Sequence, residues 1–392
     1  MNKLSGLGIE NQIQVWISAL VLIMSTLWLV NHLQKTQNRW LIKCTDWLPP
    51  ILFAYLIPAF GRIVIPIESI IPPLSWFSKS FLIPAAVFSV MAGLNIRSLK
   101  SVWPKPIMLF LSGSFIIASL PILILGVAKL FFVEIYLDWQ STELWKGLVP
   151  IVGSWIGGST SQVVLKEIID TPDPLFLSVL LIDNIAVNIW TILMFQWIKK
   201  SDLIDSKWGV PKEKNTELNA DKKKGSWWSL ELLVIIGYSI ISYLLPWSFL
   251  NMILFTSLLG LLISTLIPKW NTTNSLLWAG WLIILVMVFL GFKLDFSDWN
   301  IPLSLISVVL VWFVLHALWI GLHTYIFRVP SAWLAITSMA NLGGISTAPA
   351  VTAAFDQKLM PHAVLLSILS MATGTLWGLW TIYWIQELFI TL

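Results

Sequence analysis

Long apolar runs, separated by short charged or Pro/Gly-rich stretches, dominate the 392-residue chain. A helical crossing of a lipid bilayer takes about 20 residues, so runs of this length predict membrane-spanning helices. In the first half they lie near residues 13–31, 47–61, 78–94, 106–133 and 174–198, with a glycine-interrupted segment at 144–170. The second half repeats the plan near 228–246, 249–267, 275–294, 300–327 and 361–386, with an interrupted segment at 330–356.

Composition agrees with an all-α polytopic membrane protein. Apolar residues make up 57% of the chain and charged residues only 11%, whereas a soluble domain carries about a quarter charged residues. This argues against a water-soluble enzyme, a nucleic-acid-binding protein and a disordered chain. The net charge of +4 does not imply a nucleic-acid partner, because basic residues in membrane proteins mostly mark cytoplasmic loops.

The two halves also match in their motifs. IGGSTS at 156–161 corresponds to LGGIST at 342–347, and MAGLNIRSLKS at 91–101 to FLGFKLDFSDW at 289–299. Glycine-broken segments in corresponding places are typical of transporters built from repeats, with the binding site at the breaks. We therefore predict a first repeat at 1–198, a basic linker at 199–226 and a second repeat at 227–392.

Charge placement bears on whether these repeats are inverted. If both interrupted segments crossed the membrane, each half would cross six times and the linker with its eight lysines would lie outside, against the positive-inside tendency. If both are re-entrant hairpins, each half has five crossings, the second half is inverted, and the linker is cytoplasmic. The segment with Glu134, Asp138 and Glu143 then becomes external. We expect the hairpin arrangement, with a broken helix that crosses fully as the alternative.

Polar residues gather at the glycine pairs and are the candidate solute-binding residues. Helix ends exposed at such breaks offer N–H groups to an anion, and hydroxyl and carbonyl oxygens can hold a hard cation such as sodium. The alternative is that small residues only allow close helix packing. The candidates are Gly157, Gly158, Ser159, Thr160, Ser161, Asn341, Gly343, Gly344, Ser346 and Thr347.

Asp183 is the second strong signal, because it lies near the centre of an uninterrupted apolar run. A charged residue there costs several kcal/mol unless it is hydrated or paired. We therefore predict a site for a coupling ion or proton; a purely structural acid is the alternative. Asn184 and Asn188 share its helix, and Ser370 and Thr375 lie in the equivalent region of the second half, so the carboxylate belongs to one half only.

Other chemistry lacks support in the sequence. Cys44 is the only cysteine and the four histidines are scattered, so we expect neither a disulfide nor a metal cluster. P-loop, HExxH and Ser/His/Asp patterns are lacking, so we expect no enzyme activity and no cofactor beyond possible Na⁺. Lys166 and Glu167 follow the first glycine pair; they could contact solute in a vestibule or cap the segment at the membrane interface.

The segments GSWIGGSTSQVVLKEI, LLIDNIAVN and MANLGGISTAPAVTAAF resemble the bacterial integral-membrane family catalogued as domain of unknown function 819. That family is similar to the glutamate:sodium symporters and, more distantly, to the bile-acid:sodium symporters and sodium/proton antiporters. The resemblance implies inverted five-crossing repeats, a mobile core domain, a scaffold domain that forms a homodimer, elevator-type alternating access and a bacterial inner-membrane location. GGSTSQ and GGIST differ from the asparagine-aromatic pair after GGS and the GGPxT pattern of many relatives.

The resulting expectation is a secondary active transporter, embedded in membrane lipids, that moves a small polar or anionic organic solute with Na⁺ or H⁺. The first alternative is a cation/proton antiporter without an organic substrate. The second is a membrane-embedded enzyme or receptor, which predicts a large polar loop or a His/Asp/Glu cluster that the sequence lacks.

Overall fold

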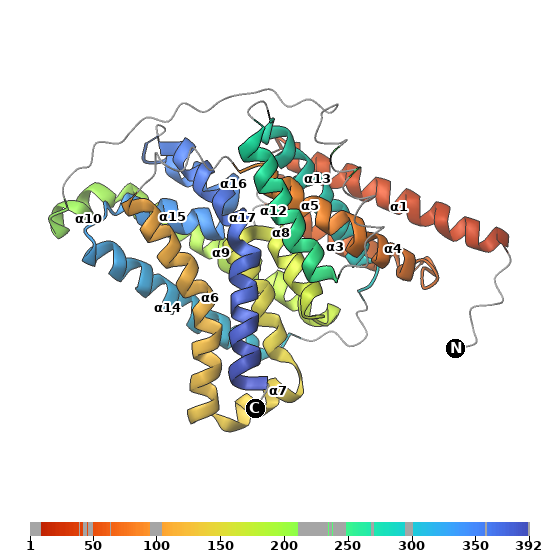
Figure 1. The fold of residues 1–392 in the computed structure, drawn as a ribbon, viewed down its shortest axis with the longest axis horizontal. Helices are drawn as coiled ribbons and strands as arrows, with labels where there is room; N and C mark the ends of the chain where they lie inside the picture. Colours follow the sequence, from red (N-terminus) through yellow and green to blue (C-terminus); the bar gives the residue numbers. More distant parts are fainter. Residues whose placement is uncertain are drawn as a thin grey trace.

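The computed structural model describes residues 9–38, 40–41, 45, 50–62, 64–94, 104–210, 234, 237, 248–267, 270–294, 301–356 and 359–390. Within these residues the regular structure is helical throughout, as the sequence predicts (Figure 1). The linker beyond residue 210 and most of the predicted span 228–246 lie outside them.

Nine helices in the described part are long and apolar enough to cross a membrane, which supports a multi-pass membrane protein. The elements of the first half are α1 (Ile9–Lys35), α3 (Pro50–Gly61), α4 (Ile71–Phe77), a π-helical turn η1 (Ser78–Leu82), α5 (Ile83–Ala92), α6 (Lys105–Phe131), α7 (Val133–Ser141), η3 (Leu144–Gly147), α8 (Leu148–Ile168), α9 (Asp173–Lys199) and α10 (Ser201–Trp208). Those of the second half are α12 (Phe249–Leu266), α13 (Thr272–Gly291), α14 (Leu303–Ile326), α15 (Ala332–Leu342), α16 (Gly344–Ala353), α17 (Met360–Ile385) and η5 (Gln386–Ile390).

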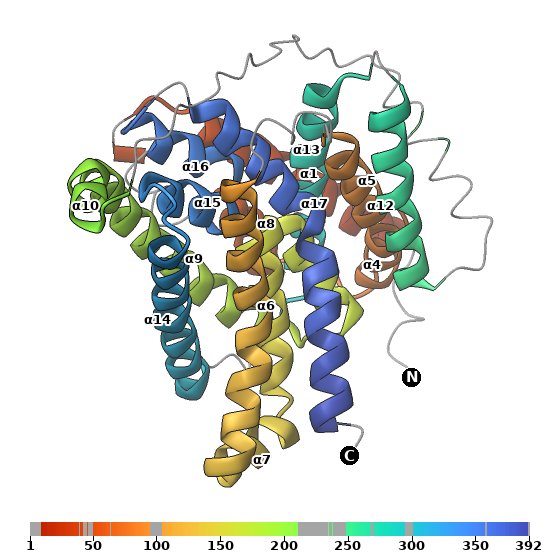
Figure 2. The same cartoon turned by 60° about the vertical axis from the view of Figure 1, so that its left-hand side comes forward.

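The helices form two groups that pack side by side (Figures 1 and 2). The broken-helix bundle consists of α6 to α10 and α14 to α17; the flanking bundle consists of α1, α3, α4, α5, α12 and α13. Each has its own apolar cluster. Residues of α8, α9 and α17, including Val163, Phe176 and Ile368, belong to the cluster of the flanking bundle, so these three helices form the contact between the groups.

Helix α8 folds back on itself at Gly158, whose φ of 68° and ψ of −166° are not helical. Residues eight apart in a straight helix would be about 12 Å apart. Yet a side chain placed on Gly153 would lie 2.8 Å from the carbonyl oxygen of Ser161. At the other end, Thr171 Oγ1 donates a hydrogen bond of 3.2 Å to the carbonyl of Lys146. The two limbs of α8 therefore lie against each other, and their open ends meet.

The second interrupted segment is also broken at a glycine. Helices α15 and α16 pack against each other across Gly344, which has a φ of 63°. Trp333, at the start of α15, lies edge-on to His362, at the start of α17, with ring centroids 5.8 Å apart. The beginning of this segment therefore lies close to the helix that follows it.

Helix α9 runs from the open end of α8 to the start of the second segment. It begins directly after α8, and near its end Trp197 Nε1 donates a 3.0 Å hydrogen bond to the carbonyl of Ser331, just before α15. In α10, Asp205 accepts from the backbone N–H of Ser331 at 2.8 Å. Since α9 has 27 residues, or about 40 Å of length, the open end of α8 and the start of α15 lie at opposite ends of α9.

Candidate functional site

Asp183 binds both limbs of the broken helix α8. Its Oδ2 accepts a 2.6 Å hydrogen bond from Ser154 Oγ on the first limb and a 3.3 Å hydrogen bond from Gln162 Nε2 on the second. The side chain is buried, at 7% exposure, and Oδ1 has no hydrogen-bond partner among the described residues. Because a buried polar atom is costly to leave unpaired, Oδ1 is the atom that a proton or a cation would satisfy.

Ser370 joins the two halves of the chain. From the middle of α17, its hydroxyl donates to the carbonyl of Ile156, beside the break in α8, and lies 2.8 Å from Oδ1 of Asn341, at the end of α15. The same Asn341 oxygen accepts a 3.1 Å hydrogen bond from Ser114 in α6. The polar atoms at the two breaks thus share one buried hydrogen-bonded group.

A close contact between α8 and α17 lies beside this group. Side-chain carbons added to Gly157 or Gly374 would overlap the other glycine's backbone, so the two helices approach closely only because neither residue has one. One residue along α17 from Gly374, Thr375 Oγ1 donates a 3.1 Å hydrogen bond to Ser161 Oγ. This contact holds the second limb of α8 against α17.

A small cleft lies on the same face, between the two bundles, and in this structure it has room for about one water molecule. Its polar lining comes from the hydroxyl residues Thr160, Ser161 and Thr375 of the broken-helix bundle and Ser257 of the flanking bundle. Its apolar lining comes from Val87, Val90, Met91, Met371 and Ala372. The cleft therefore offers hydroxyl groups from both bundles on a largely apolar background.

The remaining candidates lie around these contacts. Gly343 and Gly344 form the junction of α15 and α16, and Thr347 Oγ1 donates to the carbonyl of Gly343. Ser159 is half-buried after the break in α8. Asn184 and Asn188 are half-buried on α9, and Asn188 Nδ2 has no partner in the described structure. Ser346 lies in α16, and its side chain is outside the described residues.

Several residues of this region were not singled out from the sequence. Gln162, Ser114 and Gly374 acquire their roles from partners distant in the sequence: Asp183, Asn341 and Gly157. Gln162 could have been found from the sequence, because it directly follows the hydroxyl residues of the STSQ tetrapeptide and is a polar amide within an apolar run. Ser114 and Gly374 resemble ordinary small residues of a packed membrane helix.

The site offers oxygen and amide groups in place of a transition-metal cluster. Among the described residues, no group of three or more His, Cys, Asp or Glu side chains is placed to hold a metal ion. The oxygens of Asp183, Ser154, Ser161 and Thr375 are the ligand types that hard cations such as sodium take.

The model of the family described as a protein of unknown function, DUF819, matches residues 19–388, which confirms the resemblance carried by the glycine-pair motifs. No curated protein matches the chain.

Proposed function

The chain belongs to the DUF819 family, and we propose that it is a secondary active transporter of a small polar or anionic organic solute, coupled to Na⁺ or H⁺. One observation carries this proposal: Asp183 is hydrogen-bonded to both limbs of a broken helix, and the second limb also lines the cleft between the two bundles. A buried carboxylate that holds both limbs of such a helix can transmit ion binding to the solute-binding face.

The membrane arrangement that we propose has α8 and the α15–α16 pair as re-entrant hairpins in two inverted repeats. The meeting of the ends of α8, through Thr171 and Lys146, favours a hairpin over a crossing helix, because a crossing helix would separate these residues by the membrane thickness. The open end of α8 and the start of α15 lie at opposite ends of α9, as two inverted repeats require. By order in the two halves, α3 corresponds to α12 and α5 to α13. The contact between α3 and α13 therefore has its counterpart in the contact between α12 and α5.

Solute binding is assigned to the cleft and to the start of the second limb of α8. The N–H groups that follow Gly158 lie at a helix start, where an anionic group is favoured. Thr160 and Ser161 lie in the same turn and line the cleft. A solute bound there would contact both bundles, so movement of the broken-helix bundle along the flanking bundle would carry the solute across the membrane. We propose this elevator-type movement in the inner membrane of a bacterium, with the flanking bundle forming the homodimer contact.

The experiment has two steps. The purified protein is first screened by thermal shift against organic acids, amino acids and short peptides, with and without Na⁺, because a ligand of the native state raises its apparent stability. The protein is then reconstituted into proteoliposomes. Uptake of the stabilising compound into them is driven by a Na⁺ or a pH gradient. We expect Asp183→Asn to abolish gradient-driven uptake, and Asp138→Asn, which changes an exposed acid on α7, to leave it intact. Full ion-dependent uptake by Asp183→Asn would refute the proposal.

A cation/proton antiporter is the second candidate, favoured by the buried Asp183 carboxylate that holds both limbs of α8 near its break. In that case an imposed Na⁺ or K⁺ gradient alone would move protons into or out of proteoliposomes that contain a pH-sensitive dye. Proton flux without any organic solute would favour the antiporter, and its absence would favour solute transport.

A further inference from the structure

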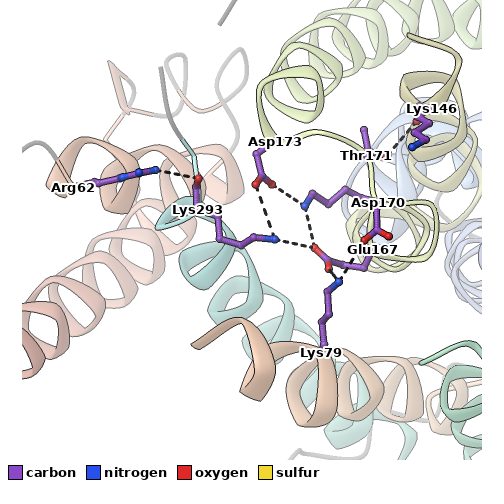
Figure 3. Close-up of polar contacts among 9 residues, drawn as sticks. Arg62, Lys79, Lys146, Glu167, Asp170, Thr171, Asp173 and Lys293 are labelled. Carbon is purple, nitrogen blue, oxygen red and sulfur yellow. Dashed lines mark hydrogen bonds and ion pairs between the residues drawn. The ribbon is translucent and has the colours of Figure 1, made fainter. Parts of the chain in front are cut away.

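A charged cluster lies at one end of the interface between the two bundles (Figure 3). It contains three lysines and three acids, so their formal charges balance. We call it the charge network and define it as Lys79, Lys166, Glu167, Asp170, Asp173 and Lys293.

Glu167 is the centre of the network. Its Oε2 lies 2.8 Å from Nζ of Lys79, and its Oε1 lies 3.0 Å from Nζ of Lys166 and 3.9 Å from Nζ of Lys293. The Glu167 side chain is only 2% exposed. A carboxylate this deeply buried depends on its cationic partners, because an unpaired buried charge costs several kcal/mol.

The other two acids extend the network on both sides of Glu167. Asp173 lies 2.7 Å from Lys166 and 4.0 Å from Lys293, and Asp170 lies 3.6 Å from Lys79. Arg62 Nη1 donates to the carbonyls of Lys293 and Leu294 at 3.2 and 3.3 Å. These last contacts join the end of α13 to the end of α3, so the backbone of Lys293 is tied to the flanking bundle.

The ion pairs cross from one bundle to the other. Lys79 in η1 and Lys293 after α13 belong to the flanking bundle, whereas Lys166, Glu167 and Asp173 lie in or next to α8 and α9 of the broken-helix bundle. Lys79–Glu167 is therefore a contact between two bodies that the proposed transport cycle would move apart.

The second limb of α8 runs from the cleft to the charge network. Along α8, Glu167 follows the cleft residue Ser161 by six positions, about 9 Å. Between them, the fully buried Val163 and Val164 pack in one apolar cluster with Leu82 and Ile83 of the flanking bundle. An apolar layer thus covers the cleft at this end, and the charge network lies beyond it.

We infer that the charge network is a gate that locks the two bundles together and keeps the cleft closed at this end. Replacing a buried ion pair by apolar groups is often close to neutral in free energy, whereas removing one partner is strongly unfavourable. Such a contact is specific when closed, yet it can open when the bundles separate and water hydrates the charges. The gate's place in a transport cycle rests on the proposed function; its action as a lock does not.

The charge distribution assigns this gate to the external face. The network lies at the end of α8 that follows Glu134, Asp138 and Glu143, the acidic segment that the positive-inside tendency places outside. With this assignment, the gate closes the cleft toward the outside.

The test measures how often the interface opens and requires no knowledge of the solute. A single cysteine is introduced as Val164→Cys in a Cys44→Ser background, and its reaction with a membrane-impermeant maleimide is followed in intact cells. Because this position is buried in the interface, its labelling rate reports the population of the open state. We expect Lys79→Gln and Glu167→Gln to raise the rate about tenfold or more. The first leaves the buried Glu167 carboxylate with one cation fewer, and the second removes the acid that Lys79, Lys166 and Lys293 contact.

The matched control is Glu143→Gln. It removes a 2.7 Å ion pair with Lys146 at the same end of the molecule, but within one bundle, and it should leave the rate unchanged. Lys79→Arg keeps the pair and should label at the parent rate, and size-exclusion profiles establish that each variant is folded. Equal rates in all variants, or an equal rise in Glu143→Gln, would overturn the gate. Since labelling requires no transport, either result stands apart from the uptake assays.

Discussion

Ser370 lies 2.8 Å from Oδ1 of Asn341 and also donates to the carbonyl of Ile156, so one hydroxyl connects the two broken segments. Ser370 is ten residues beyond the start of α17 at Met360, just as Asp183 is ten residues beyond the start of α9 at Asp173. The two halves therefore place a hydroxyl and a carboxylate at corresponding positions. Because only the first half has a carboxylate at this position, the proposed ion coupling is assigned to Asp183.

Removal of the Ser370 hydroxyl should destabilise the protein. In Ser370→Ala the carbonyl of Ile156 and the amide of Asn341 lose a buried partner, which costs about 1–3 kcal/mol. Ser367→Ala is the control, because Ser367 is equally buried one turn earlier on α17 but donates only to the carbonyl of Ala363 in its own helix. Thermal unfolding in detergent should show a lower Tm for Ser370→Ala than for Ser367→Ala. Equal values would mean that the contact between the two breaks contributes little.

Close approach of α8 and α17 predicts a second contrast. In Gly374→Ala the added methyl group would overlap the backbone of Gly157, and overpacking of this kind costs about 1–3 kcal/mol. A methyl group on Gly321 in α14 meets no atom within 4 Å, so Gly321→Ala should be neutral or stabilising by up to about 1 kcal/mol. Tm values of the two purified variants test this, and a destabilised Gly321→Ala would contradict the packing argument.

The sequence predicts the helices well and their partners poorly. Predicted runs such as 174–198 and 249–267 lie within one residue of the ends of α9 and α12, because hydropathy and flanking charges fix where a helix can lie in a membrane. Asp183 and the glycine pairs are recognisable because an acid or a paired glycine is unusual in an apolar run. The cross-bundle ion pairs of Glu167 cannot be recognised in this way. Lys79 and Lys293 are distant from Glu167 in the sequence, and a lysine at the end of a helix can equally face lipid headgroups.

Lys293 predicts a pH dependence of stability. Burial lowers its pKa below the ordinary value of 10.5, repulsion from Lys166 lowers it further, and Glu167 and Asp173 offset only part of this. The folded protein therefore binds this proton less tightly than the unfolded chain does. The resulting destabilisation is full below the lowered pKa and is relieved as pH rises toward 10.5.

Lys293→Met should accordingly be at least as stable as the parent protein at pH 7. The Tm difference between variant and parent should shrink as pH is raised through the alkaline range, because the parent loses the unfavourable charge. A Lys293→Met protein that is strongly destabilised at pH 7 would show that the charge of Lys293 is needed to hold the network.

The turn of α8 predicts a contrast between two glycines that have open space around them. Gly158 and Gly209 both have positive φ, at 68° and 65°, and a side chain on either would meet no atom within 4 Å. They differ in ψ, which is −166° at Gly158 and 33° at Gly209. Asparagine adopts the left-handed helical conformation of Gly209 readily, whereas the conformation of Gly158 is essentially restricted to glycine and costs other residues about 1–3 kcal/mol.

Gly209→Asn should therefore keep the parent Tm, and Gly158→Asn should lower it and reduce ligand-induced stabilisation, since it alters the turn that orients Thr160 and Ser161. Parent-like behaviour of Gly158→Asn would show that the break in α8 tolerates another backbone conformation and does not define the site.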